Sequence, residues 1–198
     1  MVVIARSQRL YLREVTLEDA EVFFRMDSDP MVMRHIGDGS IVTDPDVTRA
    51  ALSRIIAAYP TRPGLGLWAC CLLDGSACVG WLALKPCPLR FPDAAEGDGV
   101  EPTTPHIEIG YRLIPECWGR GYATEMTVTL LKHAFDGLGL ERVVAACTPA
   151  NAASSRVMVK AGLTYQGEGL YGATRCDVYA AARDRWAPPA PFSSTSSG

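Results

Sequence analysis

The order of apolar segments in the second half of the chain constrains its fold most strongly. Runs with strand character alternate there with segments whose apolar residues recur at helical spacing. Proline and glycine residues separate one segment from the next. This order predicts the α+β class, with helices interleaved among strands. The expected elements are a strand at 107–114, a turn at 118–121, a helix ending near 138, a strand at 142–147, a short helix starting at 151, and closing strands at 163–166 and 176–182.

The first half of the chain predicts two helices after a strand-like run at 10–12. Thr16 is a suitable cap for a helix that runs to about Met26, because its hydroxyl can accept a hydrogen bond from a free amide of the first turn. Pro45 fits the first position of a second helix, where the missing N–H would have no helical partner in any case. The apolar face expected for this second helix consists of Val47, Ala51, Leu52, Ile55 and Ile56.

A hairpin and a long loop are expected in the middle of the chain. Asp74 and Gly75 separate two apolar runs at 67–73 and 78–84, which is typical of a β-hairpin. Residues 86–105 are rich in proline, glycine and acidic side chains, and they predict an acidic insertion loop. If this loop lies beside an acceptor cleft, its carboxylates attract a cationic substrate. A loop that is merely solvated is the alternative.

The charge balance excludes several classes of partner. The 198 residues include 19 Lys+Arg and 22 Asp+Glu, which leaves a formal net charge of −3. Binding to a nucleic-acid backbone or to an anionic membrane needs a basic surface, so neither partner is expected. The apolar runs are shorter than the roughly 20 residues of a membrane span, and Arg6 interrupts the N-terminus too early for a secretory signal. We therefore expect a soluble, cytoplasmic protein.

The cysteines and the C-terminal segment carry no sign of a further function. The seven cysteines form no C-x-x-C pair, and the chain has three histidines. This pattern predicts no metal site and indicates reduced, mostly buried thiols. Residues 187–198 are rich in proline and serine and predict a disordered tail. A single domain is accordingly expected over residues 1–186.

The turn at 118–121 is the first candidate for a binding site. Gly119 and Gly121 allow a tight turn and the close approach of a ligand, and the following helix N-terminus offers free N–H donors and a partial positive charge. Such a turn suits a pyrophosphate, although a purely structural turn is the alternative. A Walker loop is excluded because Tyr122, not lysine, follows Gly121. A dinucleotide fingerprint would need a third small residue where Thr124 stands.

Together with its surroundings, this turn resembles the acetyl-CoA-binding core of the GNAT superfamily of N-acetyltransferases. The motifs that carry the resemblance lie at 107–115, 118–125 and 151–163. Residues 29–37 also fit the branch that includes the ribosomal-protein N-terminal (alanine/serine) acetyltransferases. The resemblance extends over about residues 8–186. It implies a GNAT-type acyltransferase fold, whose central mixed, mostly antiparallel sheet is splayed at the cofactor site and has helices on both faces.

The resemblance also implies a reaction and a set of cofactor contacts. An acetyl group would pass from acetyl-CoA to a primary amine, on a protein N-terminus or a small molecule, by direct attack in a ternary complex without a metal. The backbone around Leu113 and Ile114 would pair with the pantetheine arm, and Asn151 would lie beside it. The resemblance leaves a monomer and a homodimer both open. The backbone amides expected to cradle the pyrophosphate belong to Arg120, Gly121, Tyr122, Ala123 and Thr124.

Glu108 is the leading candidate for the general base, because it lies on the strand expected to line the cleft. A carboxylate that is simply paired on the strand face is the alternative, and His106 is a weaker candidate. Many relatives place a tyrosine where this chain has Met158, which cannot donate a proton to the leaving thiolate. Ser154 is a substitute donor, unless it is merely structural. A backbone amide near Leu113 would stabilise the developing oxyanion.

The missing tyrosine motivates a second hypothesis. A non-catalytic, acyl-CoA-binding regulatory module would retain the cofactor motifs without a complete set of proton-transfer groups. A third hypothesis, an RNA- or ribosome-associated structural protein, disagrees with the acidic charge balance.

Overall fold

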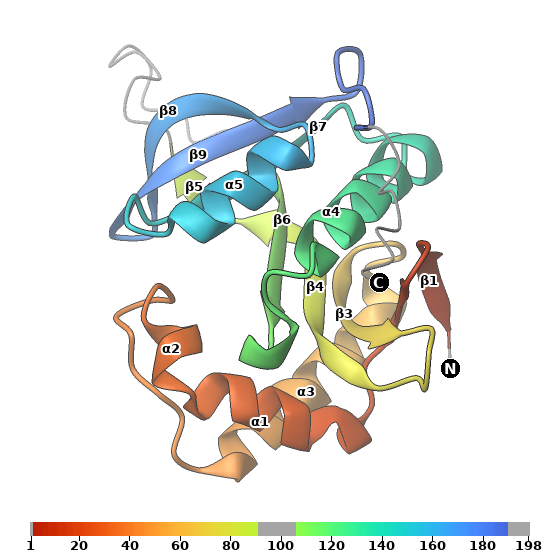
Figure 1. Cartoon of the computed structure of the whole chain (residues 1–198), viewed down its shortest axis with the longest axis vertical. Helices are drawn as coiled ribbons and strands as arrows, with labels where there is room; N and C mark the ends of the chain where they lie inside the picture. Colours follow the sequence, from red (N-terminus) through yellow and green to blue (C-terminus); the bar gives the residue numbers. More distant parts are fainter. Residues whose placement is uncertain (1, 91–105, 190–198) are drawn as a thin grey trace, which may run out of the picture.

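One curved sheet organises the chain in a computed structural model that describes residues 2–90 and 106–189 (Figure 1). Within these residues the strands form a nine-stranded sheet in the order β1-β2-β3-β4-β6-β7-β9-β8-β5. The strands are β1 (Val3–Arg6), β2 (Leu10–Glu14), β3 (Gly66–Leu72), β4 (Cys78–Cys87), β5 (Leu89–Arg90), β6 (His106–Leu113), β7 (Arg142–Cys147), β8 (Thr164–Tyr171) and β9 (Thr174–Ala182). The β6–β7 pair is parallel and the other pairs are antiparallel. The expected α+β class and mixed, mostly antiparallel sheet are confirmed.

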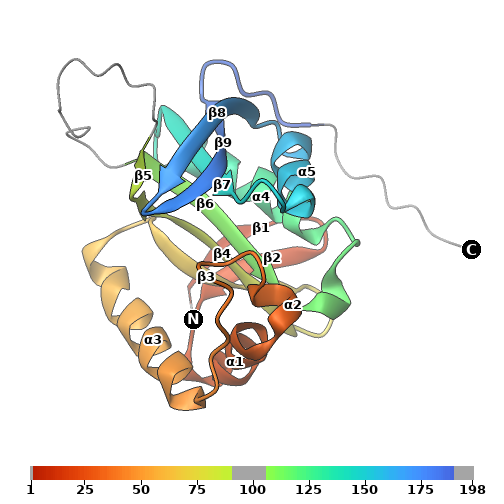
Figure 2. The same ribbon diagram turned by 90° about the vertical axis from the view of Figure 1, so that its left-hand side faces the viewer.

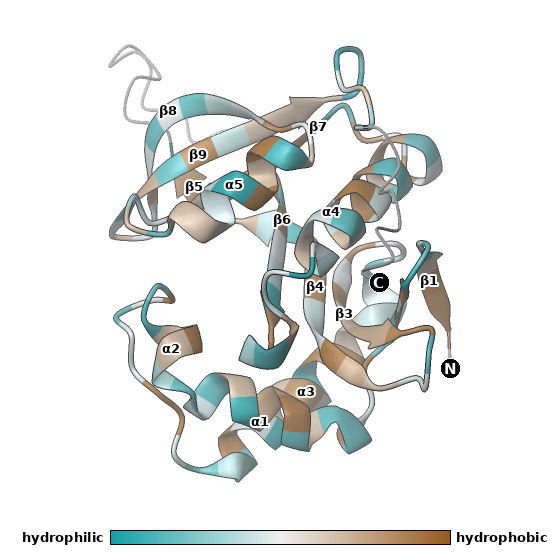
Figure 3. Cartoon of the chain, in the orientation of Figure 1, coloured by the Kyte–Doolittle hydropathy of each residue, from teal (hydrophilic) through white to brown (hydrophobic). Residues whose placement is uncertain are grey.

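Helices cover both faces of this sheet, as expected. They are α1 (Ala20–Ser28), α2 (Pro30–Met33), α3 (Pro45–Ala58), α4 (Tyr122–Lys132) and α5 (Ala152–Lys160). Figures 1 and 2 show α1, α2 and α3 gathered together, away from α4 and α5. Helices α1, α4 and α5 each carry both apolar and polar residues (Figure 3), as helices that bury one side do. No helix among the described residues is long and apolar enough to cross a membrane.

Strand alternation assigns neighbouring residues to different cores. Leu10 and Leu12 belong to the cluster that packs under α4 and α5, whereas Tyr11 belongs to the cluster under α1 and α3. On β6, Ile109 and Leu113 face the α4–α5 cluster. The even-numbered residues of β6 therefore face the opposite side of the sheet.

The sheet opens between β6 and β7. Strand β6 pairs with β4 along its whole length, from His106 opposite Cys87 to Leu113 opposite Gly80. On its other edge it pairs with β7 at one position, Glu108 opposite Val144. Beyond that position the two strands diverge, so the splay implied by the resemblance is confirmed.

The predicted elements need several corrections. Residues 86–90 are not loop, because Pro86 and Cys87 extend β4, and Leu89–Arg90 forms β5 against β8. Proline has no N–H to donate, and the ring nitrogen of Pro86 faces the β3 side of β4. Pairing with β3 stops at Gly66, opposite Leu84, so no strand requires a hydrogen bond from residue 86. The rest of the predicted acidic loop, 91–105, lies outside the described residues. So does most of the predicted tail, and residues 187–189 contain no helix or strand.

The buried face of α3, the length of β8 and two further elements also differ from the prediction. In α3, Val47 is exposed and Thr48 is buried instead, because the Thr48 hydroxyl donates to Asp27 Oδ2 (3.2 Å) on α1. Strand β8 runs on to Tyr171 through Gly169, where a Cβ would meet β9 and the Arg90 carbonyl. Strand β1 and helix α2 were not predicted. The cysteines in the described residues are free thiols, six of them buried and Cys78 partly so, as expected.

We expect Gly80→Ala to destabilise the sheet beside the opening. The φ of Gly80 is +152°, and a Cβ there would lie 2.8 Å from Leu113 Cα and still closer to the Arg112 carbonyl oxygen. Such a clash between two backbones should lower the free energy of unfolding by about 2–4 kcal/mol, measured by urea denaturation. Gly110→Ala is the matched control, since its Cβ would make an ordinary 3.8 Å contact with Trp81. Equal losses in both variants would contradict this account.

Candidate active site

The turn after β6 has the backbone of an anion-binding loop. Gly119 and Gly121 have φ values of +74° and +77°, in the left-handed region that glycine adopts without strain. A Cβ on Gly119 would meet nothing within 4 Å, so conformation and not crowding demands glycine there. The indole of Trp118 donates to the Leu113 carbonyl (2.8 Å) and holds the turn against the end of β6.

Helix α4 begins with unpaired amides. The amide of Glu125 donates to the Gly121 carbonyl (3.0 Å), which is the first hydrogen bond of the helix. The amides of Tyr122, Ala123 and Thr124 precede it and therefore have no helical acceptor. Because these amides carry the positive end of the helix dipole, the arrangement suits a phosphate group. Arg120 lies exposed in the turn, where its charge adds to the same field.

The exposed edge of β6 continues this site toward the middle of the sheet. The amide of Ile114 donates to the Val79 carbonyl (3.0 Å), so the expectation that it pairs with a cofactor is wrong for this N–H. Hydrogen-bonded and non-hydrogen-bonded pairs alternate along antiparallel strands, so the N–H of Leu113 points away from β4 and toward the opening. The backbone of Tyr111 points the same way. An extended arm laid beside β6 would meet these groups.

Helix α5 is tied to β6 beside the opening. The Tyr111 hydroxyl lies 3.0 Å from the Ser154 carbonyl oxygen and 2.9 Å from Ser154 Oγ. Burial raises the pKa of Tyr111, so its hydroxyl stays protonated. Asn151 caps the helix, since its Oδ1 accepts from the Ser154 amide (3.1 Å). The short helix expected from residue 151 is confirmed, and the Tyr111 hydroxyl is a partner of Ser154 that sequence reasoning did not identify.

Glu108 is buried on the opposite face of β6 and pairs with a lysine whose side chain is 42% exposed. Its Oε1 is 2.6 Å from Lys85 Nζ on β4 and accepts from the Tyr171 hydroxyl on β8 (2.8 Å). Both contacts fall on Oε1, and among the described residues no hydrogen bond to Oε2 is present. Burial, followed by the hydrogen bond to Glu108, raises the pKa of Tyr171, so this hydroxyl remains a donor. Sequence reasoning missed Lys85 and Tyr171.

The two predicted catalytic residues thus flank the opening from different sides. Even-numbered Glu108 faces away from α5, whereas odd-numbered Tyr111 contacts Ser154 on α5. His106 shares the Glu108 face, and burial lowers its pKa. Met158 is buried and offers no proton, as predicted from its side chain. A reacting group in the opening would have a carboxylate on one side and two hydroxyls on the other.

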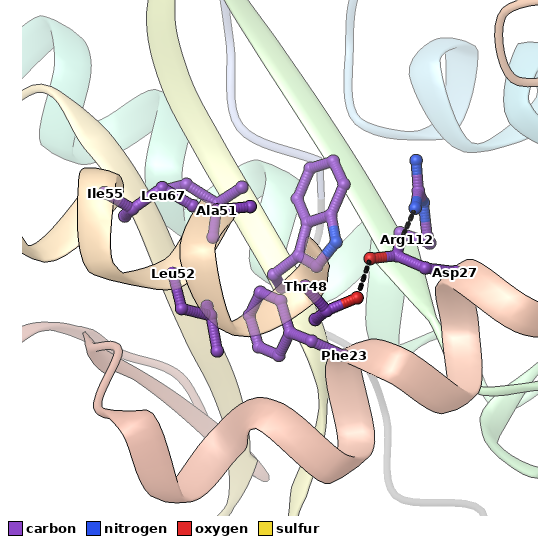
Figure 4. Close-up of a pocket in the computed structure, with 9 residues that line it drawn as sticks. Phe23, Asp27, Thr48, Ala51, Leu52, Ile55, Leu67 and Arg112 are labelled. Atoms are coloured by element: carbon purple, nitrogen blue, oxygen red, sulfur yellow. Dashed lines mark hydrogen bonds and ion pairs between the residues drawn. The ribbon is translucent and has the colours of Figure 1, made fainter. Parts of the chain in front are cut away.

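A cavity of about 140 Å³ lies on the Glu108 side of the sheet, between α1, α3 and the strands (Figure 4). Arg112 Nη1 pairs with Asp27 Oδ1 (2.5 Å), and the guanidinium lies 5.2 Å from the centre of the Trp81 ring. Arg112 Nε is buried without a hydrogen-bond partner in the described part of the chain. The remaining lining is mostly apolar. Sequence reasoning did not identify Arg112, Asp27 or Trp81 as residues beside the site.

We expect Asn151→Ala to lower the free energy of unfolding by about 1 kcal/mol, because the Ser154 amide loses its acceptor. Denaturant unfolding measures the loss. Asn151→Asp restores an acceptor and serves as the control. An equal loss in both variants would show that the cap contributes nothing.

Among the described residues, no group of three or more His, Cys, Asp or Glu side chains is placed to hold a metal ion.

Comparisons with known proteins agree with this geometry. The family model "Acetyltransferase (GNAT) domain" matches residues 9–164. The FsC-acetyl coenzyme A-N(2)-transacetylase of Aspergillus fumigatus is 31% identical over 160 residues, which cover 80% of this chain and 64% of that protein. The chain thus spans slightly less than two thirds of that relative's length.

Solved structures resemble the chain in fold. The acetyltransferase (GNAT family) from Bacillus anthracis superposes with a TM-score of 0.73 and 24% identity, covering 93% of this chain and 100% of that one. RimL, a ribosomal L7/L12 alpha-N-protein acetyltransferase solved with coenzyme A, has a TM-score of 0.71 and 18% identity. The superposition covers 92% of this chain and 99% of RimL. At these identities the likeness concerns the fold alone. Because the family model matches most of the chain and the fungal relative covers four fifths of it, the chain belongs to the GNAT family of acetyltransferases.

Proposed function

We propose that the chain transfers an acetyl group from acetyl-CoA to a primary amine by direct attack in a ternary complex. The observation that carries this proposal is the continuity of the left-handed glycine turn, the unpaired amides of α4 and the open edge of β6. A phosphate group fits the first two features and an extended pantetheine arm fits the third. Acetyl-CoA supplies the activated thioester. We place the protein in the cytoplasm as a monomer or homodimer.

The residues present fit such a cosubstrate. The amides of Tyr122, Ala123 and Thr124 would hold the pyrophosphate, with Arg120 beside them. The N–H of Leu113 points into the opening, where it would stabilise the negative charge that develops on the thioester oxygen. A preorganised donor of this kind contributes about 3 kcal/mol to catalysis. Both backbone groups of Ile114 are engaged, because its carbonyl accepts from the Cys117 amide (3.0 Å), so the pantetheine arm would pair with the Tyr111 backbone instead.

The proton transfers are assigned to the two sides of the opening. Glu108 would accept the proton of the attacking amine through Oε2 or through a water molecule, because Oε1 is engaged by Lys85 and Tyr171. Ser154 would supply the proton for the leaving thiolate and recover a proton from solvent, while the Tyr111 hydroxyl, 2.9 Å away, orients the serine. The Tyr111–Ser154 pair would replace the tyrosine that this chain lacks at Met158.

A protein N-terminus is the acceptor class that such a weakly basic site serves best. An α-amine with a pKa near 8 is neutralised at pH 7 for about 1 kcal/mol, whereas a lysine near 10.4 costs about 4.6 kcal/mol. The Lys85 contact occupies Glu108 Oε1, so one carboxylate oxygen remains for proton transfer. The motif at residues 29–37 supports the ribosomal-protein branch, whose substrates are protein α-amines, as the relevant one.

We expect Glu108→Gln to lower kcat/KM at least 100-fold in an assay that follows thiol release from acetyl-CoA with a peptide amine. Ser154→Ala should lower kcat by about 10-fold with little change in KM for acetyl-CoA. Ser155→Ala is the matched control, because Ser155 Oγ lies 2.7 Å from the Tyr179 hydroxyl and does not contact Tyr111. Full activity in Glu108→Gln would remove this residue as the base.

We also expect peptides with a free N-terminus to react faster at pH 7 than N-blocked peptides with a single lysine. The difference of about 2.4 pH units between the two amines corresponds to a factor of roughly 250 in the neutral fraction. The preference, measured as the ratio of kcat/KM values, should shrink as the pH rises. A preference for lysine at pH 7 would contradict the proposed acceptor class.

The ion-paired state of Glu108 and the burial of Met158 favour one second candidate, a non-catalytic acyl-CoA-binding regulatory module. Calorimetric binding of CoA without amine-dependent thiol release across peptides, polyamines, amino acids and aminoglycosides would identify it. Thiol release with any of these amines would exclude it.

A further inference from the structure

Arg9 lies beside the proposed phosphate turn although it belongs to the other end of the chain. It follows β1 in the β1–β2 hairpin, which packs against α4 (Figure 1). Its backbone is fixed on both sides, because its N–H donates to Glu125 Oε1 (2.9 Å) and its carbonyl accepts from the Leu73 amide (2.9 Å). The position of this residue is therefore set before any ligand arrives.

The guanidinium of Arg9 is held as firmly as the backbone. Its Nε and Nη2 each lie 2.7 Å from Oε2 of Glu125, a residue only 3% exposed in the first turn of α4. Its Cζ lies 4.7 Å from the centre of the Tyr122 ring. Nη2 would be 3.5 Å from a Cβ on Gly121, which places the guanidinium directly beside the left-handed glycine.

The pairing with Glu125 leaves donors for an anion. A guanidinium has five N–H donors, and Glu125 engages one on Nε and one on Nη2. Among the described residues no acceptor is present for Nη1, and the Arg9 side chain is 39% exposed. A partner that is itself exposed rarely fixes the position of an arginine side chain. Here the partners are a buried carboxylate and an aromatic ring, which together fix the guanidinium.

The negative charge of Glu125 also affects how well the turn can bind a phosphate. A carboxylate in the first turn of α4 repels a phosphate at the same helix end, and the Arg9 charge cancels this repulsion. Arg9 could thus act by neutralising Glu125 alone or by contacting the ligand. The side-chain contacts favour direct contact, since they orient the guanidinium and leave Nη1 unused.

We propose that Arg9 is a direct ligand for a phosphate group of CoA, positioned by Glu125 and Tyr122. This inference rests on the proposed function, because it assumes that CoA binds at the turn before α4. It adds a cofactor contact from the β1–β2 hairpin to those from the turn, 116 residues away from Glu125 in sequence.

Calorimetric dissociation constants for CoA, 3′-dephospho-CoA and pantetheine test the proposal. In Arg9→Gln, we expect binding of CoA to weaken about 10-fold and binding of pantetheine, which lacks phosphates, to stay unchanged. An effect that persists with 3′-dephospho-CoA assigns the contact to the pyrophosphate, and one that disappears assigns it to the 3′-phosphate. Arg6→Gln removes a charge from the same hairpin, where Arg6 lies over Tyr11, and should not change CoA binding.

The double variant Arg9→Gln/Glu125→Gln separates the two roles. It removes the buried carboxylate together with the cation, so it also limits the loss of stability expected when Glu125 is left unpaired. If Arg9 contacts the phosphate, CoA binding stays about 10-fold weak in the double variant. Recovery to within twofold of wild type would overturn the proposal and leave neutralisation as the only role. Failure of the wild-type protein to bind CoA would instead overturn the proposed function.

Discussion

The unequal pairing of β6 is the constraint on which the rest of the structure depends. One edge of this strand is fully bonded to β4, and the other meets β7 at a single position. Unpaired backbone groups in a sheet interior are costly, so such an edge persists only when the neighbouring elements hold it open. Here the Gly80 backbone fits closely against β6, and Trp118 and Tyr111 anchor the turn and α5 beside the gap.

Buried polar contacts fix the parts around that edge. Glu125 joins α4 to the first hairpin, Glu108 joins β6 to β4 and β8, and Asp27 joins α1 to β6 and α3. Each carboxylate has a cationic partner and at least one further hydrogen bond, which is the condition under which a buried charge is tolerated. Such contacts orient elements more strictly than apolar packing does, because a hydrogen bond depends on direction as well as distance.

Local signals in the sequence predicted the parts of the site that are built locally. The glycine turn, the helix starting at 151 and the strand at 107–114 follow from residues a few positions apart. The partners of Glu108 and Ser154 could not be predicted in this way, because Tyr171 and Tyr111 are 63 and 43 residues from them. Those contacts depend on strand register and on which face each residue takes, and a single sequence specifies neither. The predicted start of the loop at Pro86 was wrong for a similar reason, because a proline fits in β4 only where the pairing with β3 has stopped.

The alternation of β6 has an evolutionary consequence. Odd-numbered residues face the helices that accompany the glycine turn, and even-numbered residues such as Arg112 face the cavity under α1 and α3. Substitutions on one face leave the other face's contacts in place, because both share only the backbone. Residues that line the cavity, such as Arg112, can therefore change without disturbing the contact of Tyr111 with α5, as long as Glu108 is kept. The strand divides the site into two faces that can vary independently of each other.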